Sequence, residues 1–231
     1  MSKKFKGKTC VYCAKRASTS ADHVIAREFL LPGKRENLPK VPACDICQRE
    51  KSKLEHYLTT VLPFGARHPD AALTLERLVP KRLAKNVALH RQIANQMSTV
   101  WTDELGFYAP TKAIPLDDNA VDILFSFIVK GLIWHHWKTW LPVDHFIQTR
   151  MYTLYGLQWF HDHIFSLNAG AVAKGNLGNG VFVYEGHQGV KAPHVTAWRM
   201  SLYGLIVPGD EGPPGLCFGS VSGPQSILQR S

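Results

Sequence analysis

The chain has 231 residues, of which 45% are hydrophobic and 19% charged, a composition that excludes a disordered or low-complexity protein. Its 27 Lys and Arg exceed its 18 Asp and Glu, for a net charge of +9. Residues 1–60 hold 13 of the basic and 6 of the acidic side chains, so the excess is concentrated near the N-terminus. Such a field indicates a polyanionic partner such as nucleic acid, although a well-solvated surface would have the same composition.

Two CxxC pairs, Cys10/Cys13 and Cys44/Cys47, mark this basic segment, and 30 residues lie between them. A CxxC turn presents two thiolates together, and zinc takes four such ligands in a tetrahedron. The two pairs therefore predict a structural zinc ion, with an iron–sulfur cluster as the alternative. A small module with little core of its own gains much of its folding free energy from such a site.

The elements expected around the cysteines are short. Residues Asp22–Glu28 are expected to be extended or a turn, and Leu31–Lys40, with two prolines and a glycine, to be a loop. The second cysteine pair opens a helix expected over Asp45–Thr60. Pro and Gly cluster at Leu62–Pro69 and predict a boundary there, which gives two domains, 1–60 and 61–231.

The second domain is expected to begin with helices and to end with strands. The predicted helices are Ala71–Met97, divided by Pro80, then Asp117–Trp140, and a third from Asp144 to about Leu167. After a Gly/Asn-rich loop at Gly170–Gly180, the predicted strands are Val181–Tyr184, His194–Leu205 and Leu216–Val221.

The segments around the cysteines read DHVI…ENLPKVPACDICQREKSKLE. This order resembles the pattern DHxxP…NLxxxPxCxxCNxxKS of the HNH (ββα-metal) endonucleases that carry a four-cysteine zinc. The resemblance covers residues 8–58, about a quarter of the chain. It implies an α+β fold in which a zinc-clamped ββα-metal module precedes the helical region and a small antiparallel sheet.

The resemblance also implies roles for individual residues. His23 becomes the general base that activates water, since a histidine titrates near neutral pH. Asp22 becomes a ligand of one Mg²⁺ or Mn²⁺ ion, which stabilises charge on the phosphate. Asn37 matches the residue that orients the histidine, although a plain turn residue would also suit this position. The substrate implied is DNA, with RNA possible, and the product ends are 5′-phosphate and 3′-hydroxyl.

One departure from the pattern concerns the metal. The family has Asn or His directly after the second CxxC, whereas this chain has Gln48, whose longer side chain costs more rotamer entropy to hold in place. Glu55 lies seven residues further along the predicted helix, on the same face, and is a candidate for an additional ligand. A solvated helix charge would also explain Glu55. Ala26 replaces the Pro of the pattern, a minor difference.

Phosphate contacts are expected from four basic residues of the module, Lys15, Arg16, Arg27 and Lys51. The second domain is expected to select the substrate, bind a partner protein or form a homodimer. With neither a secretory signal nor a membrane span in the sequence, a cytoplasmic protein is expected. Two further interpretations stay open: a nucleic-acid-binding module whose catalytic metal site has lapsed, and a protein-interaction subunit of a larger complex.

Overall fold

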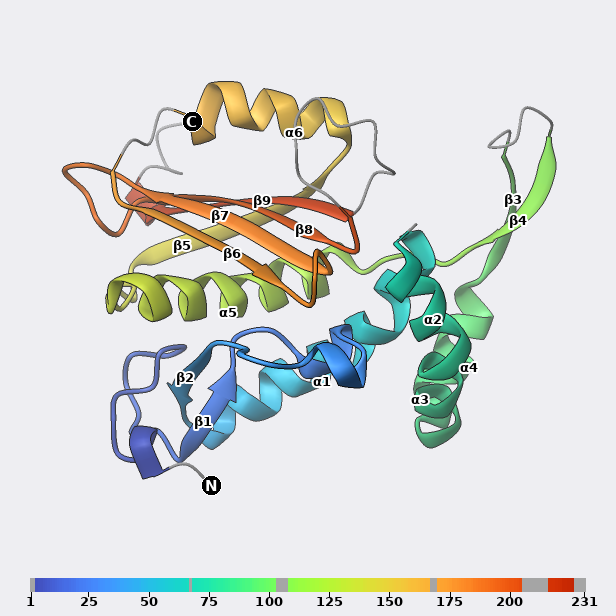
Figure 1. Cartoon of the computed structure of the whole chain (residues 1–231), viewed down its shortest axis with the longest axis horizontal. Coiled ribbons are helices and arrows are strands. Elements are labelled where there is room, and N and C mark those ends of the chain that lie inside the picture. The colour runs from blue at the N-terminus through green and yellow to red at the C-terminus, as the bar shows by residue number, and fades with distance from the viewer. Residues whose placement is uncertain (1–2, 67, 103–107, 167–169, 205–215, 227–231) are drawn as a thin grey trace.

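A computed structural model describes residues 3–66, 68–102, 108–166, 170–204 and 216–226. Its N-terminal part is an antiparallel hairpin, β1 (Ser20–His23) and β2 (Lys40–Ala43), in which His23 pairs with Lys40. Helix α1 (Asp45–Val61) follows β2 directly. The helix predicted from Asp45 is confirmed, and it runs from the hairpin, at the lower left of the view, toward the middle of the molecule (Figure 1).

Short helices follow in the middle of the chain: α2 (Pro69–Arg77), α3 (Val79–Lys85) and α4 (Val87–Gln96). The predicted division at Pro80 is confirmed, since this proline occupies the first turn of α3. A second division follows, where the Asn86 side chain accepts a hydrogen bond from the Leu89 amide and caps α4.

A β-hairpin that the sequence did not predict comes next. Strand β3 (Ser98–Thr102) pairs with β4 (Ala109–Ala113), and the pair extends away from the rest of the molecule (Figure 1). Its residues are mostly exposed, with Trp101 65% exposed. A strand with one buried face is recognised in a sequence by its alternation of apolar and polar residues. Because neither face of this hairpin is buried, that alternation is weak here.

Helix α5 (Asp118–Trp137) is the central element of the fold (Figure 1). It begins where the Asp117 carboxylate accepts a hydrogen bond from the Ala120 amide, at 3.0 Å. It ends at Lys138, whose φ of 55° is left-handed, so the helix stops three residues before the predicted Trp140.

The C-terminal part is a five-stranded antiparallel sheet in the order β5-β9-β8-β7-β6. The strands are β5 (His145–Tyr152), β6 (Val172–Leu177), β7 (Phe182–Gln188), β8 (Thr196–Leu202) and β9 (Leu216–Pro224). Between β5 and β6 lie α6 (Leu154–Phe160) and a π-helical turn, His161–Phe165. The α+β class with a small antiparallel sheet after the helices is confirmed.

Two expectations for this region were wrong. The helix expected from Asp144 to Leu167 is instead strand β5 followed by the short α6, because residues 145–152 pair along their whole length with β9. The loop expected at Gly170–Gly180 contains strand β6, which pairs with β7, and the left-handed turn residues occur only at 178–180.

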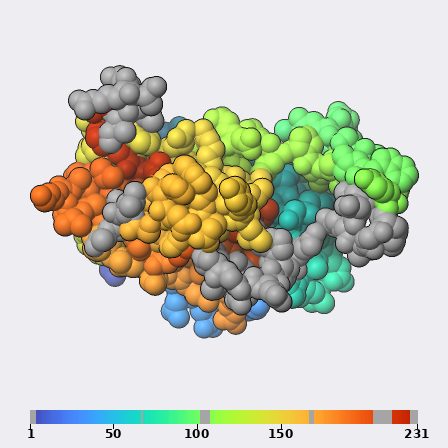
Figure 2. Space-filling model, turned by 90° about the horizontal axis from the view of Figure 1, so that it is seen from above, coloured from blue at the N-terminus to red at the C-terminus, as the bar shows by residue number. Residues whose placement is uncertain are grey.

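The sheet is covered on both faces. On one face α5 packs against it, with Trp137 5.2 Å from Trp198 and Phe125 stacked on Phe218 at 4.1 Å. On the other face α6 lies over the middle of the sheet (Figure 2), where the Phe160 ring contacts Tyr152. No helix in the described ranges is long and apolar enough to cross a membrane.

The hairpin–helix module also packs on α5, from the side opposite the sheet. The Tyr12 and Phe127 rings meet edge to face at 5.0 Å, and one cluster of buried side chains runs from the module through α5 into the sheet. The division into domains at residue 60 stays a prediction. What the structure shows is an apolar core that both sides share through α5.

Candidate functional site

The four cysteines of the two CxxC pairs converge on one point. Their Sγ atoms all lie within 4.8 Å of one another, close enough to bind a single metal ion. Cys10 and Cys13 lie on a turn closed by the Ala14 amide, which donates to the Cys10 carbonyl at 2.9 Å. Cys44 is the residue directly before α1, and Cys47 lies in the first turn of this helix. The prediction that these thiols form one metal site is confirmed, and four sulfur ligands are consistent with zinc.

The surroundings act differently on the individual thiols: burial raises the pKa of Cys10 and Cys47, whereas the pKa of Cys13 is lowered. Burial alone raises the pKa of Cys13, but hydrogen bonds with the backbone amides of Lys15 and Arg16 and with the Cys10 and Cys47 side chains together outweigh burial and bring the pKa to about 7. The Arg16 side chain donates to Cys44, and that hydrogen bond raises the arginine pKa. From α5, Lys130 faces the same thiols; burial lowers its pKa, and the thiolates oppose this. Four thiolates with one bound zinc ion carry a net charge of about −2, and the positive charges of Arg16 and Lys130 partly offset it.

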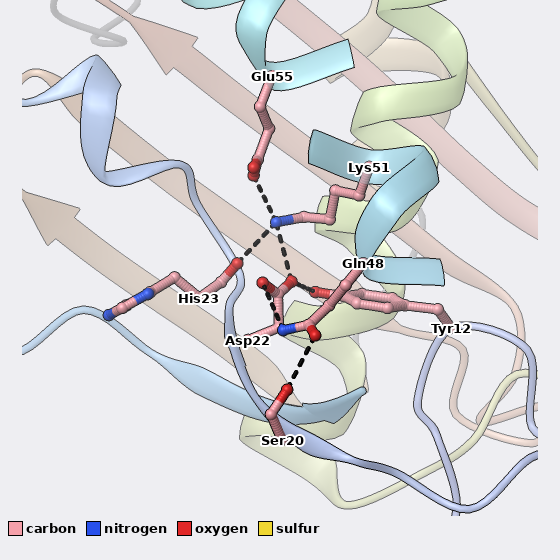
Figure 3. Close-up of polar contacts among 7 residues, drawn as sticks. All are labelled: Tyr12, Ser20, Asp22, His23, Gln48, Lys51 and Glu55. Atoms are coloured by element: carbon pink, nitrogen blue, oxygen red, sulfur yellow. Dashed lines mark hydrogen bonds and ion pairs between the residues drawn. The ribbon is translucent and has the colours of Figure 1, made fainter. Parts of the chain in front are cut away.

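Next to the cysteine cluster, the Asp22 carboxylate is held by polar groups from the cysteine turn and α1 (Figure 3). The Tyr12 hydroxyl donates to Asp22 Oδ2 at 2.6 Å, and the Gln48 amide nitrogen lies 3.5 Å from Oδ1. In turn the Ser20 hydroxyl donates to the Gln48 amide oxygen at 2.8 Å. Burial, with Asp22 adding to it, keeps the Tyr12 pKa well above its usual value, so the hydroxyl stays a donor.

Lys51 of α1 completes this cluster. Its Nζ lies 2.5 Å from Glu55 Oε1, 3.1 Å from Asp22 Oδ2 and 2.7 Å from the His23 carbonyl oxygen. The side chain is only 1% exposed. The expectation that Lys51 contacts a phosphate is therefore corrected, because its ammonium is enclosed among oxygens and is out of reach of a bound strand.

His23 ends strand β1, and its imidazole points away from the Asp22 carboxylate (Figure 3). Adjacent strand residues direct their side chains to opposite sides, which accounts for the divergence. Burial lowers the pKa of His23, nearby Lys40 and Arg27 lower it further, and Asp22 opposes them. The ring is therefore neutral at pH 7, the form that a general base needs.

The other predicted residues lie on the surface. Lys15, Arg16 and Arg27 are exposed. Asn37 is exposed as well, with a left-handed φ of 54°, a conformation that Asn adopts more readily than most residues. Within the described residues no hydrogen bond joins Asn37 to His23, so its orienting role stays a prediction.

Sequence reasoning missed Tyr12 and Ser20. Tyr12 lies between the first two cysteines, so the turn that binds the metal also carries the hydroxyl that holds Asp22. The sequence shows that Tyr12 lies close to the cysteines, but it does not show that the Tyr12 side chain points toward Asp22.

The two carboxylate oxygens of Asp22 differ in their contacts, and Oδ1 is the one that is open to a hard divalent cation. Among the described residues, Asp22 Oδ1 has only the long contact with Gln48. A half-turn of that amide, after which the Ser20 hydroxyl would accept from the amide nitrogen, would bring the amide oxygen toward Oδ1. Asp22 Oδ2 and Glu55, in contrast, are engaged by Lys51. Asp22 Oδ1 and, after such a turn, the Gln48 amide oxygen are thus the two oxygens that a hard cation could use here, whereas the lysine ammonium already fills the place beside Glu55.

No protein-family model matches this chain, and no curated protein or solved structure matches it either.

Proposed function

We propose that this chain is a metal-dependent HNH-type endonuclease that hydrolyses phosphodiester bonds in DNA. The observation that supports it most is the placement of Asp22 and His23 at the end of a β-hairpin, with Gln48 of the following helix beside Asp22. The four clustered cysteines connect the turn that precedes this hairpin to the start of the helix that follows it.

In this proposal His23 accepts a proton from the attacking water, which its neutral imidazole can do at pH 7. Asp22 and Gln48 would hold one Mg²⁺ or Mn²⁺ ion, which supplies charge stabilisation at the phosphate. Lys15, Arg16 and Arg27 would contact the DNA backbone without reading its sequence. Because catalytic contacts often form only with substrate bound, we expect His23 to meet the phosphate when DNA lies across the end of β1.

The test is cleavage of supercoiled plasmid DNA in Mg²⁺ or Mn²⁺ by the zinc-loaded chain. We expect nicked or linear products from the native protein and from His163→Ala, an exposed histidine in the π-helical turn after α6. We expect at least a hundredfold slower cleavage from His23→Ala, in line with the loss of a general base. Equal cleavage by both variants would show that His23 is not the base.

A second candidate is a nucleic-acid-binding module without catalysis. The burial of Lys51 in the Asp22 cluster favours it, since the lysine side chain already occupies the space beside the carboxylate where a metal ion would bind. Salt-dependent DNA binding with no cleavage in either metal, and no Mn²⁺ binding, would support this candidate over the nuclease.

A further inference from the structure

The Lys51 ammonium is fully coordinated. An ammonium has three N–H donors, and three oxygens surround this one, from Asp22, Glu55 and the His23 main chain. The Tyr12 ring lies 5.9 Å away and adds a cation–π contact. A side chain that is 1% exposed keeps its charge only where oxygens replace its water in this way.

The Lys51 ammonium excludes a divalent cation from the space between the Asp22 and Glu55 carboxylates. The two carboxylates, Asp22 and Glu55, come from different elements and meet at a single cation, the ammonium between them. A divalent ion in the same place would have to displace the ammonium or face it at contact distance, where like charges repel strongly in a partly buried site. Glu55 is thus committed to Lys51.

We infer that Lys51 is a built-in cation that keeps Glu55 out of metal binding and conceals a second divalent-cation position between Asp22 and Glu55. The first half rests on the proposed function, since it concerns the ion expected at Asp22 Oδ1 and Gln48. The second half does not, because the concealed position follows from the two carboxylates alone. Replacing Lys51 with a neutral side chain should uncover it.

The test is titration of the zinc-loaded full chain with Mn²⁺, followed by electron paramagnetic resonance of free Mn²⁺, with no DNA present. In Glu55→Gln we expect Mn²⁺ affinity within about twofold of native, since Glu55 is not a ligand. In Lys51→Met we expect at least tenfold tighter binding. Adding Glu55→Gln to Lys51→Met should abolish that gain. Lys53→Met, an exposed lysine of the same helix, serves as the control for charge alone and should change affinity little.

Two results would overturn the inference. One is a large loss of Mn²⁺ affinity in Glu55→Gln, which would make Glu55 a ligand while Lys51 is present. The other is a folded, zinc-containing Lys51→Met protein that binds Mn²⁺ no more tightly than native. If Lys51→Met does not fold, the Glu55→Gln measurement still decides the first half. If native protein binds no Mn²⁺, the proposed function fails, while the gain in Lys51→Met still tests the second half.

Discussion

The contacts of Lys51 and Glu55 show how far the role of a single residue could be predicted from the sequence. Their spacing of four on a helix is a signal for an ion pair, yet the sequence suggested a phosphate contact for one and a metal ligand for the other. The proximity of Asp22 to Gln48 followed from the motif and is found in the structure. The contacts of Tyr12 and Lys51 with Asp22 could not be predicted, because they depend on how β1, α1 and the cysteine turn face one another.

A second ionic cluster, on the sheet, gives a prediction at the scale of one residue. Burial would raise the pKa of Glu185, but hydrogen bonds from Lys174, Arg199 and His187 lower it to about 2. Because the folded pKa lies below the unfolded value of 4.5, the stabilisation is complete above pH 4.5 and is lost as pH falls toward 2. We expect the free energy of unfolding to drop by about 1–2 kcal/mol over this range through Glu185 alone.

Urea unfolding at several pH values would measure this change. Glu185→Gln should remove that part of the pH dependence and leave a flatter curve between pH 4.5 and pH 2. Glu36→Gln, a substitution of an exposed carboxylate in a loop, is the control and should keep the native slope. An unchanged slope in Glu185→Gln would show that the cluster contributes nothing to acid sensitivity.

At the scale of elements, prediction succeeded where one local signal decides the structure. Helix α1 begins directly after Cys44 of the second cysteine pair, and α5 begins at the predicted aspartates, where the Asp117 side chain caps it. Strand β5 was missed because its sequence, HFIQTRMY, lacks clear alternation and becomes a strand only through pairing with β9, some 70 residues away along the chain. Strand β6 was missed for the same kind of reason, since its glycine and asparagine favour a loop locally.

The contact of α5 with the N-terminal module gives a prediction at this scale. A Cβ at Gly131 of α5 would lie 2.9 Å from both Cγ atoms of Val24, just after β1. Gly131→Ala should therefore force the module away from the helix and destabilise the protein by about 1–3 kcal/mol, despite the better helix propensity of alanine. Thermal unfolding by circular dichroism would measure it. Gly33→Ala, where a Cβ meets nothing within 4 Å, should cost little, and equal effects would contradict the packing argument.

For the whole molecule, the sequence predicted two domains but not that they share a core. The aromatic pairs Phe5–Trp134 and Tyr12–Phe127 connect the module to α5, whose other side packs on the sheet. The apolar character of α5 was evident from the sequence. Which surfaces it would cover was not, because that depends on contacts between segments far apart in the chain.

The shared core predicts that loss of the metal is felt throughout the chain. We expect one zinc per native chain by elemental analysis and none in Cys44→Ser. The midpoint of thermal unfolding should fall by roughly 10 °C or more, in a single transition for the sheet and the module together. Cys217→Ala, a change in the sheet away from the cluster, should retain zinc. Unfolding of the module alone, with the sheet unaffected, would contradict a shared core.

The most direct test of the central claim is the chemistry of the DNA ends. Supercoiled plasmid would be nicked by the zinc-loaded chain in Mg²⁺, purified and treated with DNA ligase, which seals only a 5′-phosphate next to a 3′-hydroxyl. We predict nicks that ligase closes with native protein, and almost none with His23→Ala. Intact plasmid with the native chain in both Mg²⁺ and Mn²⁺, or nicks that ligase cannot close, would contradict hydrolysis by an HNH-type site.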